Sequence, residues 1–279
     1  MTSPAILRYT AFTDTPEGGN PAGVVLDATA LSDAEMQQIA KDLAYSESAF
    51  VTTRADGSYD VRYFSPEMEV PFCGHATIAT AVALAERDGA GPLTFHTQAG
   101  EIPIETQGEN GSVTATLTSV APHVEDAPSE LLDEALKALH WSSDELDPQL
   151  PPKVSYAGAR HLILAAKTRA RLQDLDYDFE QLKAIMHAHE LVTTDLVYRE
   201  DETTFHARNP FPVGGVVEDP ATGAAAAAFG AYLRHEGLIT PPATITVHQG
   251  VDMGRPSLLT IDIEANRPEI RVSGRAVAM

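Results

Sequence analysis

The sequence predicts an α+β protein built from two similar halves. Segments with strand-like and helix-like patterns alternate along the chain, and the same order of segments occurs twice. Corresponding positions differ by 147 in two cases, Phe50 with Val197 and His75 with Thr222. With 279 residues and 43% hydrophobic content, the chain is large enough to give each half its own core.

The first half contains a strand, a helix and two further strands. A strand is predicted at residues 22–28, and a helix begins after Ser32, which forms a capping box with Glu35. Residues 49–54 and 59–66 predict strands, because β-branched and aromatic side chains alternate there with polar ones.

The second half repeats this order. Residues 160–166 form its first predicted strand, and Asp178 leads into a helix over residues 179–189. Strands are then predicted over residues 193–200 and 205–212.

Each half next contains a helix of small residues that begins at a glycine turn. The first lies within residues 71–89 and is expected to end at Gly89, and the second lies within residues 218–237. Small residues let a ligand approach the backbone, and the free amides at a helix start bind carboxylate or phosphate. Alternatively, the alanine-rich segments only allow close helix packing, and both effects can coexist.

The duplication predicts two domains with a ligand cleft between them. The first comprises residues 1–121 and about 268–279, because the last strand is expected to return to it, and the second comprises residues 122–267. The proline-rich acidic stretch 121–153, with a short helix near residues 131–139, is expected to connect them.

Charge argues against several classes of partner. The chain has 19 Lys and Arg against 40 Asp and Glu, a net charge of −21, which is unsuited to nucleic acid or an anionic lipid surface. The first residues show no basic segment followed by a long apolar run, so we expect neither export nor membrane insertion and a cytoplasmic location.

Cofactor and metal motifs are not found in the sequence. Cys73 is the single cysteine, which excludes an internal disulfide and an all-cysteine metal site in the monomer. The sequence has no GxGxxG or P-loop motif and no ligand spacing typical of a metal site. We therefore expect no cofactor and no metal.

Three titratable residues near the turns are candidate catalytic groups. Glu47 lies between the hydroxyls of Ser46 and Ser48, where the second half has a threonine. His75 lies in the first turn of its helix, where the dipole lowers its pKa and favours a neutral imidazole, and Asp219 precedes the matching turn. The alternatives are a solvent-facing glutamate, a packed histidine and an N-capping aspartate.

Cys73 adjoins the same glycine turn as His75. A thiol at a helix N-terminus can be an activated thiolate, but a buried inert thiol is the simpler interpretation.

Four motifs together resemble the PhzF-like family of phenazine biosynthesis. They are GGNPAGVVL at 18–26, SESAF at 46–50, PFCGHATIATA at 71–81 and EDPATGAA at 218–225. The resemblance covers nearly the whole chain. It implies the diaminopimelate epimerase-like fold, in which two pseudo-symmetric halves each wrap a curved mixed sheet around a central helix, and it implies a homodimer.

The resemblance also implies an activity without a cofactor, the isomerisation of trans-2,3-dihydro-3-hydroxyanthranilate, in which a glutamate moves a proton between ring carbons. Glu47 matches that glutamate, His75 matches a histidine that contacts the substrate, and Asp219 matches an aspartate beside its amino and carboxyl groups. The substrate-binding positions implied are Asn20, Ser46, Gly74, Thr222, Gly223 and Ala224. Ala224 departs from the serine that the family often has, which leaves the substrate open.

Two alternatives to this isomerase remain. The related epimerases and racemases use paired thiols, but the second motif offers Asp219 and Pro220, so only a mixed mechanism with Cys73 and a carboxylate is possible. The other alternative is a non-catalytic protein that binds a small metabolite.

Overall fold

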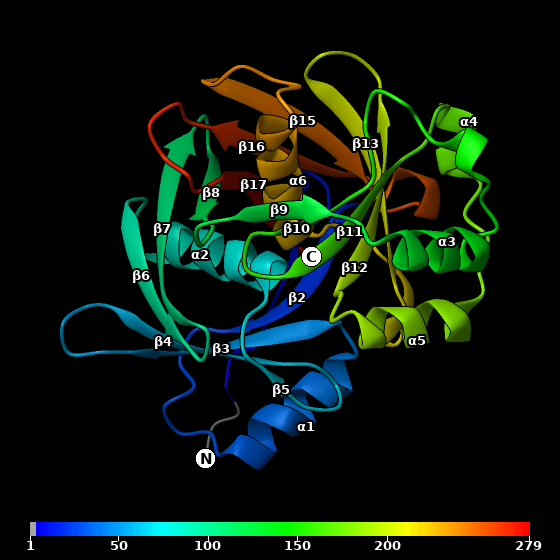
Figure 1. Ribbon diagram of the computed structural model, residues 1–279. Coiled ribbons are helices and arrows are strands. Elements are labelled where there is room, and N and C mark those ends of the chain that lie inside the picture. The colour runs from blue at the N-terminus through cyan, green and yellow to red at the C-terminus, as the bar shows by residue number, and fades with distance from the viewer. Residues whose placement is uncertain (1–3) are drawn as a thin grey trace. The chain divides into compact units, whose positions relative to one another are not determined.

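The computed structural model describes residues 4–279, and the chain divides into two compact units. Unit 1 runs to Thr118 and includes Ser273–Met279, and unit 2 is Ser119–Val272. The chain thus leaves unit 1 once and returns to it with its last strand, which is red in Figure 1.

Eight strands of unit 1 close into a barrel, since each pairs with the next and the last pairs with the first. In barrel order they are β1 (Leu7–Ala11), β2 (Asn20–Val25), β3 (Glu47–Thr53), β4 (Tyr59–Phe64), β6 (Pro92–Thr97), β7 (Gly100–Glu109), β8 (Ser112–Thr118) and β17 (Arg271–Ala278). The pairs β2–β3 and β4–β6 are parallel, so the sheet is mixed. The short β5 (Glu69–Val70) pairs with β4.

Helix α2 (Gly74–Asp88) occupies the centre of unit 1. It contacts β1, β2, β3, β7 and β8, and every residue from His75 to Ala85 is buried. Its many alanines allow this, because short side chains let the strands approach the helix from all sides. The helix ends at Gly89, as predicted.

Helix α1 (Asp33–Leu43) packs on the outside of unit 1. Ser32 and Glu35 form the predicted capping box, and Met36 packs with Phe50 and Phe64 of the sheet. The helix connects β2 with the parallel β3, and this crossover brings the chain to the start of β3.

Unit 2 has the same plan. Its strands are β9 (His123–Asp126), β10 (Lys153–Tyr156), β11 (Arg160–Ala165), β12 (Thr193–Arg199), β13 (Thr204–Phe211), β14 (Val216–Asp219), β15 (Ala243–Gln249) and β16 (Ser257–Ile263). The pairs β11–β12 and β13–β15 are parallel, like β2–β3 and β4–β6 of unit 1. Helix α6 (Gly223–His235) contacts β9, β10, β11 and β16 and is the counterpart of α2.

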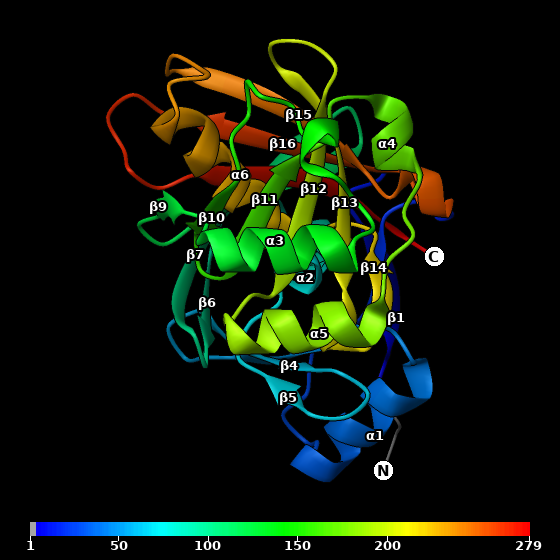
Figure 2. The same cartoon turned by 45° about the vertical axis from the view of Figure 1, so that its right-hand side comes forward.

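Three further helices belong to unit 2: α3 (Ser129–Ala138), α4 (Arg169–Gln173) and α5 (Phe179–Ala188). Figure 2 shows α3 and α5 side by side in front of the sheet, and both contribute to one hydrophobic core. Asp178 caps α5 by accepting a hydrogen bond from the backbone of Gln181, as the sequence predicted.

The stretch 121–153 was expected to be a connection with a short helix near residues 131–139; the helix is confirmed as α3, and the stretch is also an integral part of unit 2. It supplies β9, which pairs with β10, and α3, whose Leu131 and Leu136 are buried in the core together with Trp141. Its acidic and proline residues are typical of an exposed linker, but apolar residues at helical spacing give α3 a buried face.

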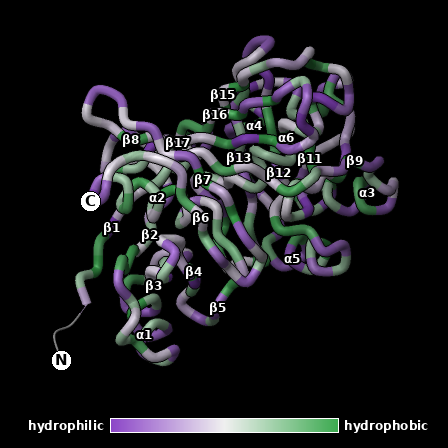
Figure 3. The backbone as a smooth tube through the Cα atoms, turned by 90° about the vertical axis from the view of Figure 1, so that its left-hand side faces the viewer, coloured by the Kyte–Doolittle hydropathy of each residue, from purple (hydrophilic) through white to green (hydrophobic). Residues whose placement is uncertain are grey.

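The predicted α+β class with two halves, each a curved mixed sheet around a central helix, is confirmed. In Figure 3 hydrophobic stretches follow the strands and central helices, and hydrophilic residues gather at loops. Of the helices in residues 4–279, none has the length and apolar character needed to cross a membrane.

Candidate active site

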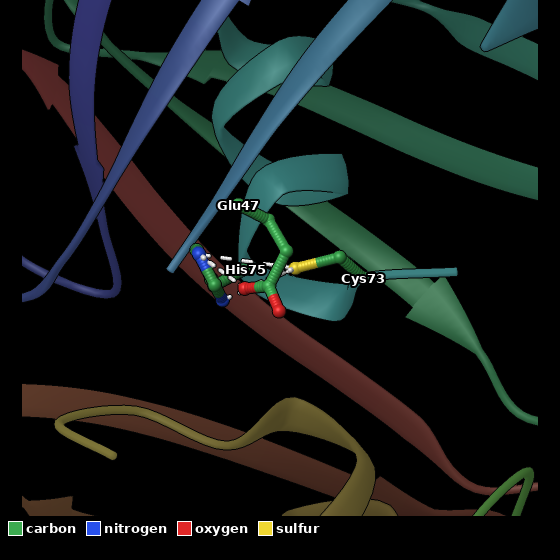
Figure 4. A group of neighbouring side chains, drawn as sticks. All are labelled: Glu47, Cys73 and His75. Atoms are coloured by element: carbon green, nitrogen blue, oxygen red, sulfur yellow. Dashed lines mark hydrogen bonds and ion pairs between the residues drawn. The ribbon is translucent and has the colours of Figure 1, made fainter. Parts of the chain in front are cut away.

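Glu47, Cys73 and His75 come together at one end of α2 in unit 1. Glu47 is the first residue of β3, Cys73 is the N-cap of α2, and His75 is the second residue of that helix. Strand β3 contacts α2, so residues far apart in the sequence become neighbours. Figure 4 shows the Glu47 carboxylate between the imidazole of His75 and the thiol of Cys73.

The side chain of Cys73 does not cap the helix that it begins. Its thiol instead donates to Glu47 Oε2 over 3.4 Å and lies 3.3 Å from His75 Nδ1. Cys73 is buried, as expected, but it contacts both candidate catalytic residues of unit 1.

His75 is a neutral imidazole fixed by its neighbours. Burial lowers its pKa, and the nearby Glu47 carboxylate and a hydrogen bond to the Pro21 carbonyl offset part of this effect. The sequence predicted the direction but assigned it to the helix dipole, whereas desolvation is the main cause. Its Nε2 lies 3.3 Å from Ser46 Oγ and 3.6 Å from Glu47 Oε2, and with a neutral ring the second contact is not an ion pair.

The Glu47 side chain is 16% exposed. The alternative of a solvent-facing glutamate is therefore wrong, although the side chain is not fully buried. A carboxylate that is partly desolvated and oriented by a thiol and an imidazole is suited to accept and return a proton.

Two other predicted residues of unit 1, Asn20 and Gly74, each adjoin in sequence a residue that forms or orients this site. Asn20 is the first residue of β2, is buried, and precedes Pro21, whose carbonyl orients His75. Gly74 begins α2 and is partly exposed, which places backbone amides at the helix start beside Cys73 and His75.

In unit 2 the matching turn is fixed by its own hydrogen bonds. Asp219 ends β14, and its Oδ2 accepts a 2.6 Å hydrogen bond from the hydroxyl of Thr222. Gln249 Nε2 donates to the Asp219 carbonyl and to Thr222 Oγ1, and Gln249 Oε1 accepts from the Thr222 amide. The alternative of an N-capping aspartate is wrong, because Thr222 is the N-cap of α6.

Gly223 and Ala224 are the first two residues of α6. Gly223 is buried and Ala224 is partly exposed, so the position where the family often has serine can be reached from outside.

Unit 2 also contains a buried polar chain that the sequence did not indicate. Thr193 donates to Asn209 Oδ1 over 2.6 Å, so the His161 Nδ1 that lies 2.8 Å from Thr193 must carry a proton and donate. Asn209 donates to Asp195 over 3.0 Å, and burial raises the pKa of Asp195 to about 7.

Gln249 was also missed as a site residue, although a signal for it existed. It lies in the VHQG segment, which ends at a glycine as FHTQAG does in the first half. Asp195 had no such signal, because the sequence TTDLV at residues 193–197 resembles a strand with one solvated face. In the structure these five residues, the first of β12, are all buried.

Comparisons with known proteins agree with this architecture. The family model PhzC-PhzF, described as "Phenazine biosynthesis-like protein", matches residues 9–279. "Uncharacterized isomerase YddE" of Escherichia coli (strain K12) is 33% identical, over 99% of this chain and 96% of its own length. "Trans-2,3-dihydro-3-hydroxyanthranilate isomerase" of Pseudomonas chlororaphis is 33% identical, over 96% of this chain and 94% of its own.

Solved structures show the same fold. A Bacillus anthracis phenazine biosynthesis protein of the PhzF family has a TM-score of 0.88 at 28% identity, covering 100% of this chain and 98% of its own. A probable proline racemase from Agrobacterium radiobacter K84 has a TM-score of 0.67 at 12% identity, covering 98% and 90%, which shows the fold alone. The predicted diaminopimelate epimerase-like fold is confirmed.

Proposed function

The chain belongs to the phenazine biosynthesis-like (PhzF) family, whose similar members are named isomerases, and we propose that it is a cofactor-independent isomerase of small cyclic amino-carboxylates. The substrate proposed for test is trans-2,3-dihydro-3-hydroxyanthranilate, which the name of the Pseudomonas chlororaphis relative specifies.

The observation that carries the proposal is the Glu47 carboxylate held between Cys73 and His75 at the start of α2. In the proposed reaction Glu47 accepts a proton from one ring carbon and returns it to another. No electrons leave the substrate, so the chemistry needs no redox group, and one carboxyl group can serve first as base and then as acid.

The other residues of unit 1 would bind the substrate and orient it. A neutral His75 can exchange hydrogen bonds with substrate hydroxyl or amino groups, and the amides beginning at Gly74 suit a carboxylate. Asn20 and Ser46 are proposed to support this arrangement, since Ser46 Oγ lies 3.3 Å from His75 Nε2.

Roles for Asp219, Thr222, Gly223 and Ala224 of unit 2 remain predictions from the family resemblance. What supports these roles is a set of hydrogen bonds within unit 2. The hydrogen bonds of Thr222 and Gln249 hold the Asp219 turn in one conformation, as a binding residue requires. We also propose a homodimer, which light scattering during size-exclusion chromatography tests directly.

The test is proton NMR in deuterated water of the purified protein with trans-2,3-dihydro-3-hydroxyanthranilate. We expect product with deuterium in the ring, and a loss of at least about 10²-fold in turnover for Glu47→Gln, because general acid–base catalysis contributes about 10²–10⁴-fold. Glu109→Gln, an exposed residue at the end of β7, is the control and should retain parental turnover. Equal deuterium incorporation in the parent and Glu47→Gln would contradict the assignment.

A second candidate is a racemase that uses Cys73 with a carboxylate. The contact of 3.4 Å between the Cys73 thiol and Glu47 favours it, because a thiol beside a carboxylate can exchange a proton at carbon. If this is the function, the parent protein exchanges the α-proton of an amino acid in deuterated water and leaves the cyclic substrate unconverted. Cys73→Ser would then abolish the exchange.

A further inference from the structure

We propose that Glu47, Cys73 and His75 form a binding site for one thiophilic divalent cation of the zinc class. All three side chains offer a ligand atom, and these atoms lie within 4.8 Å of one another. Motif spacing could not indicate this site, because the carboxylate comes from β3 whereas Cys73 and His75 stand at the start of α2.

The spacing of the three atoms fits a tetrahedral ion. The distances are 3.4 Å from Cys73 Sγ to Glu47 Oε2, 3.8 Å from Cys73 Sγ to His75 Nε2, and 3.6 Å from His75 Nε2 to Glu47 Oε2. With zinc bonds of about 2.3 Å to sulfur and about 2.0–2.2 Å to nitrogen and oxygen, tetrahedral ligands lie roughly 3.4–3.6 Å apart. Shifts of a few tenths of an ångström would therefore complete the site.

The chemistry of the three ligands selects the ion. A thiolate with an imidazole and one carboxylate suits zinc, cobalt or cadmium and disfavours magnesium or calcium, which prefer oxygen ligands. The carboxylate and the thiolate, once it has released its proton to solvent, supply two negative charges for a divalent ion.

The surroundings provide the outer support that metal sites have. The Pro21 carbonyl accepts a hydrogen bond from the His75 ring, which fixes the ring and leaves its other nitrogen as a ligand. Cys73 and His75 are buried while Glu47 is 16% exposed, so an ion can enter and water can take a fourth position.

The consequence is inhibition by the cation. An ion held by Glu47 occupies the lone pair that would accept the substrate proton. This consequence rests on the proposed function, whereas binding of the ion does not, so binding and turnover are measured separately.

Cobalt titration of the reduced, purified protein tests binding without substrate. We expect one equivalent to produce the near-ultraviolet thiolate-to-cobalt charge-transfer band and the visible bands of tetrahedral cobalt. Cys73→Ser should abolish the charge-transfer band and lower affinity by more than about 100-fold, since loss of even an outer partner costs about 10–100-fold. Glu47→Gln and His75→Gln should each keep the band but weaken binding by more than about tenfold.

His140→Asn is the matched control, because His140 lies on the surface 3.2 Å from Asp176 and could bind cobalt adventitiously. It should leave the affinity unchanged, and circular dichroism verifies that every variant is folded. An absent band in the parent, or an affinity that neither Glu47→Gln nor His75→Gln alters, overturns the site. Cobalt binding without any isomerase activity would refute the proposed function and leave the site standing.

Discussion

Asp195 is a carboxyl group whose protonated form is favoured by folding. It is buried, and its pKa is raised to about 7 because burial disfavours the charge, although Asn209 donates a hydrogen bond to it. In the unfolded chain the same group ionises near pH 4. Between these values the unfolded chain binds fewer protons than the folded one, so the free energy of unfolding falls as the pH rises.

Asp195→Asn should remove this dependence, because asparagine keeps the oxygen that Asn209 contacts and cannot ionise. The contribution is fully present below about pH 4 and lost above about pH 7, and its full size is on the order of 4 kcal/mol. Urea unfolding at several pH values should show the variant gaining stability relative to the parent across this range. Asp133→Asn, exposed on α3, is the control, and a constant difference between Asp195→Asn and the parent would contradict the prediction.

Cys73 is a neighbour of Glu47 and not the proposed base. Replacement of its thiol by a hydroxyl keeps a hydrogen-bond donor, so Cys73→Ser should lower kcat/KM for the cyclic substrate by less than about tenfold, equivalent to about 1.4 kcal/mol. The same NMR experiment measures this. A loss of turnover in Cys73→Ser as large as that in Glu47→Gln would contradict this secondary role.

Single residues differed in how far the sequence could identify them. His75 could be selected because it stands at the glycine turn of a duplicated chain, whereas Glu47 was selected through the family resemblance, and the structure brings the two within 3.6 Å. The contact of Cys73 with Glu47 could not be predicted, because it depends on how β3 packs against α2. Asp195 could not be predicted either, since a polar residue near the start of a strand is ordinarily exposed.

Helix α6 contains a glycine, Gly230, whose replacement by alanine should destabilise the protein, contrary to the usual preference of helices for alanine. Alanine in place of glycine normally stabilises a helix by about 1 kcal/mol. At Gly230, however, an added Cβ would lie 2.7 Å from Ile261 Cγ2 and 3.0 Å from Ile270 Cγ2. Gly230→Ala should therefore destabilise unit 2 by about 1–3 kcal/mol through overpacking.

Chemical denaturation of Gly230→Ala measures this as a lower midpoint. Gly108→Ala in β7 is the control, since its nearest neighbour would be Ala90 Cβ at 3.8 Å and its midpoint should change little. A raised midpoint for Gly230→Ala would mean that the sheet yields around α6 and that helix propensity dominates.

Helices whose ends carry capping residues could be predicted, and elements without such residues could not. Ser32 with Glu35, Asp178 and Gly89 mark helix ends that the structure confirms. The strands β6, β7 and β8 had no comparable signal, because their register is set by barrel closure and much of their surface is solvated. The missed β9 and β10 pair only because the intervening segment folds into the core of unit 2.

The whole molecule carries a net charge of −21, and most acidic side chains face solvent. Like charges repel one another in the compact state, and unfolding relieves this repulsion. Salt shortens the range of the interaction, from about 30 Å at 0.01 M to about 8 Å at 0.15 M. Screening should therefore stabilise the folded chain more than it weakens the surface ion pairs, which contribute little individually.

We accordingly expect the melting temperature at neutral pH to rise by several degrees between about 0.01 M and about 0.15 M sodium chloride, equivalent to roughly 1–2 kcal/mol. Calorimetry measures the shift, and the same titration at about pH 5 is the control, because partial protonation of the carboxylates reduces the charge to be screened. A melting temperature that falls with salt at neutral pH would show that surface ion pairs such as Arg62 with Glu69 and Arg171 with Glu145 outweigh the general repulsion. Acidic composition would then be offset by local pairing, and the charge of this chain would limit its partners without weakening its fold.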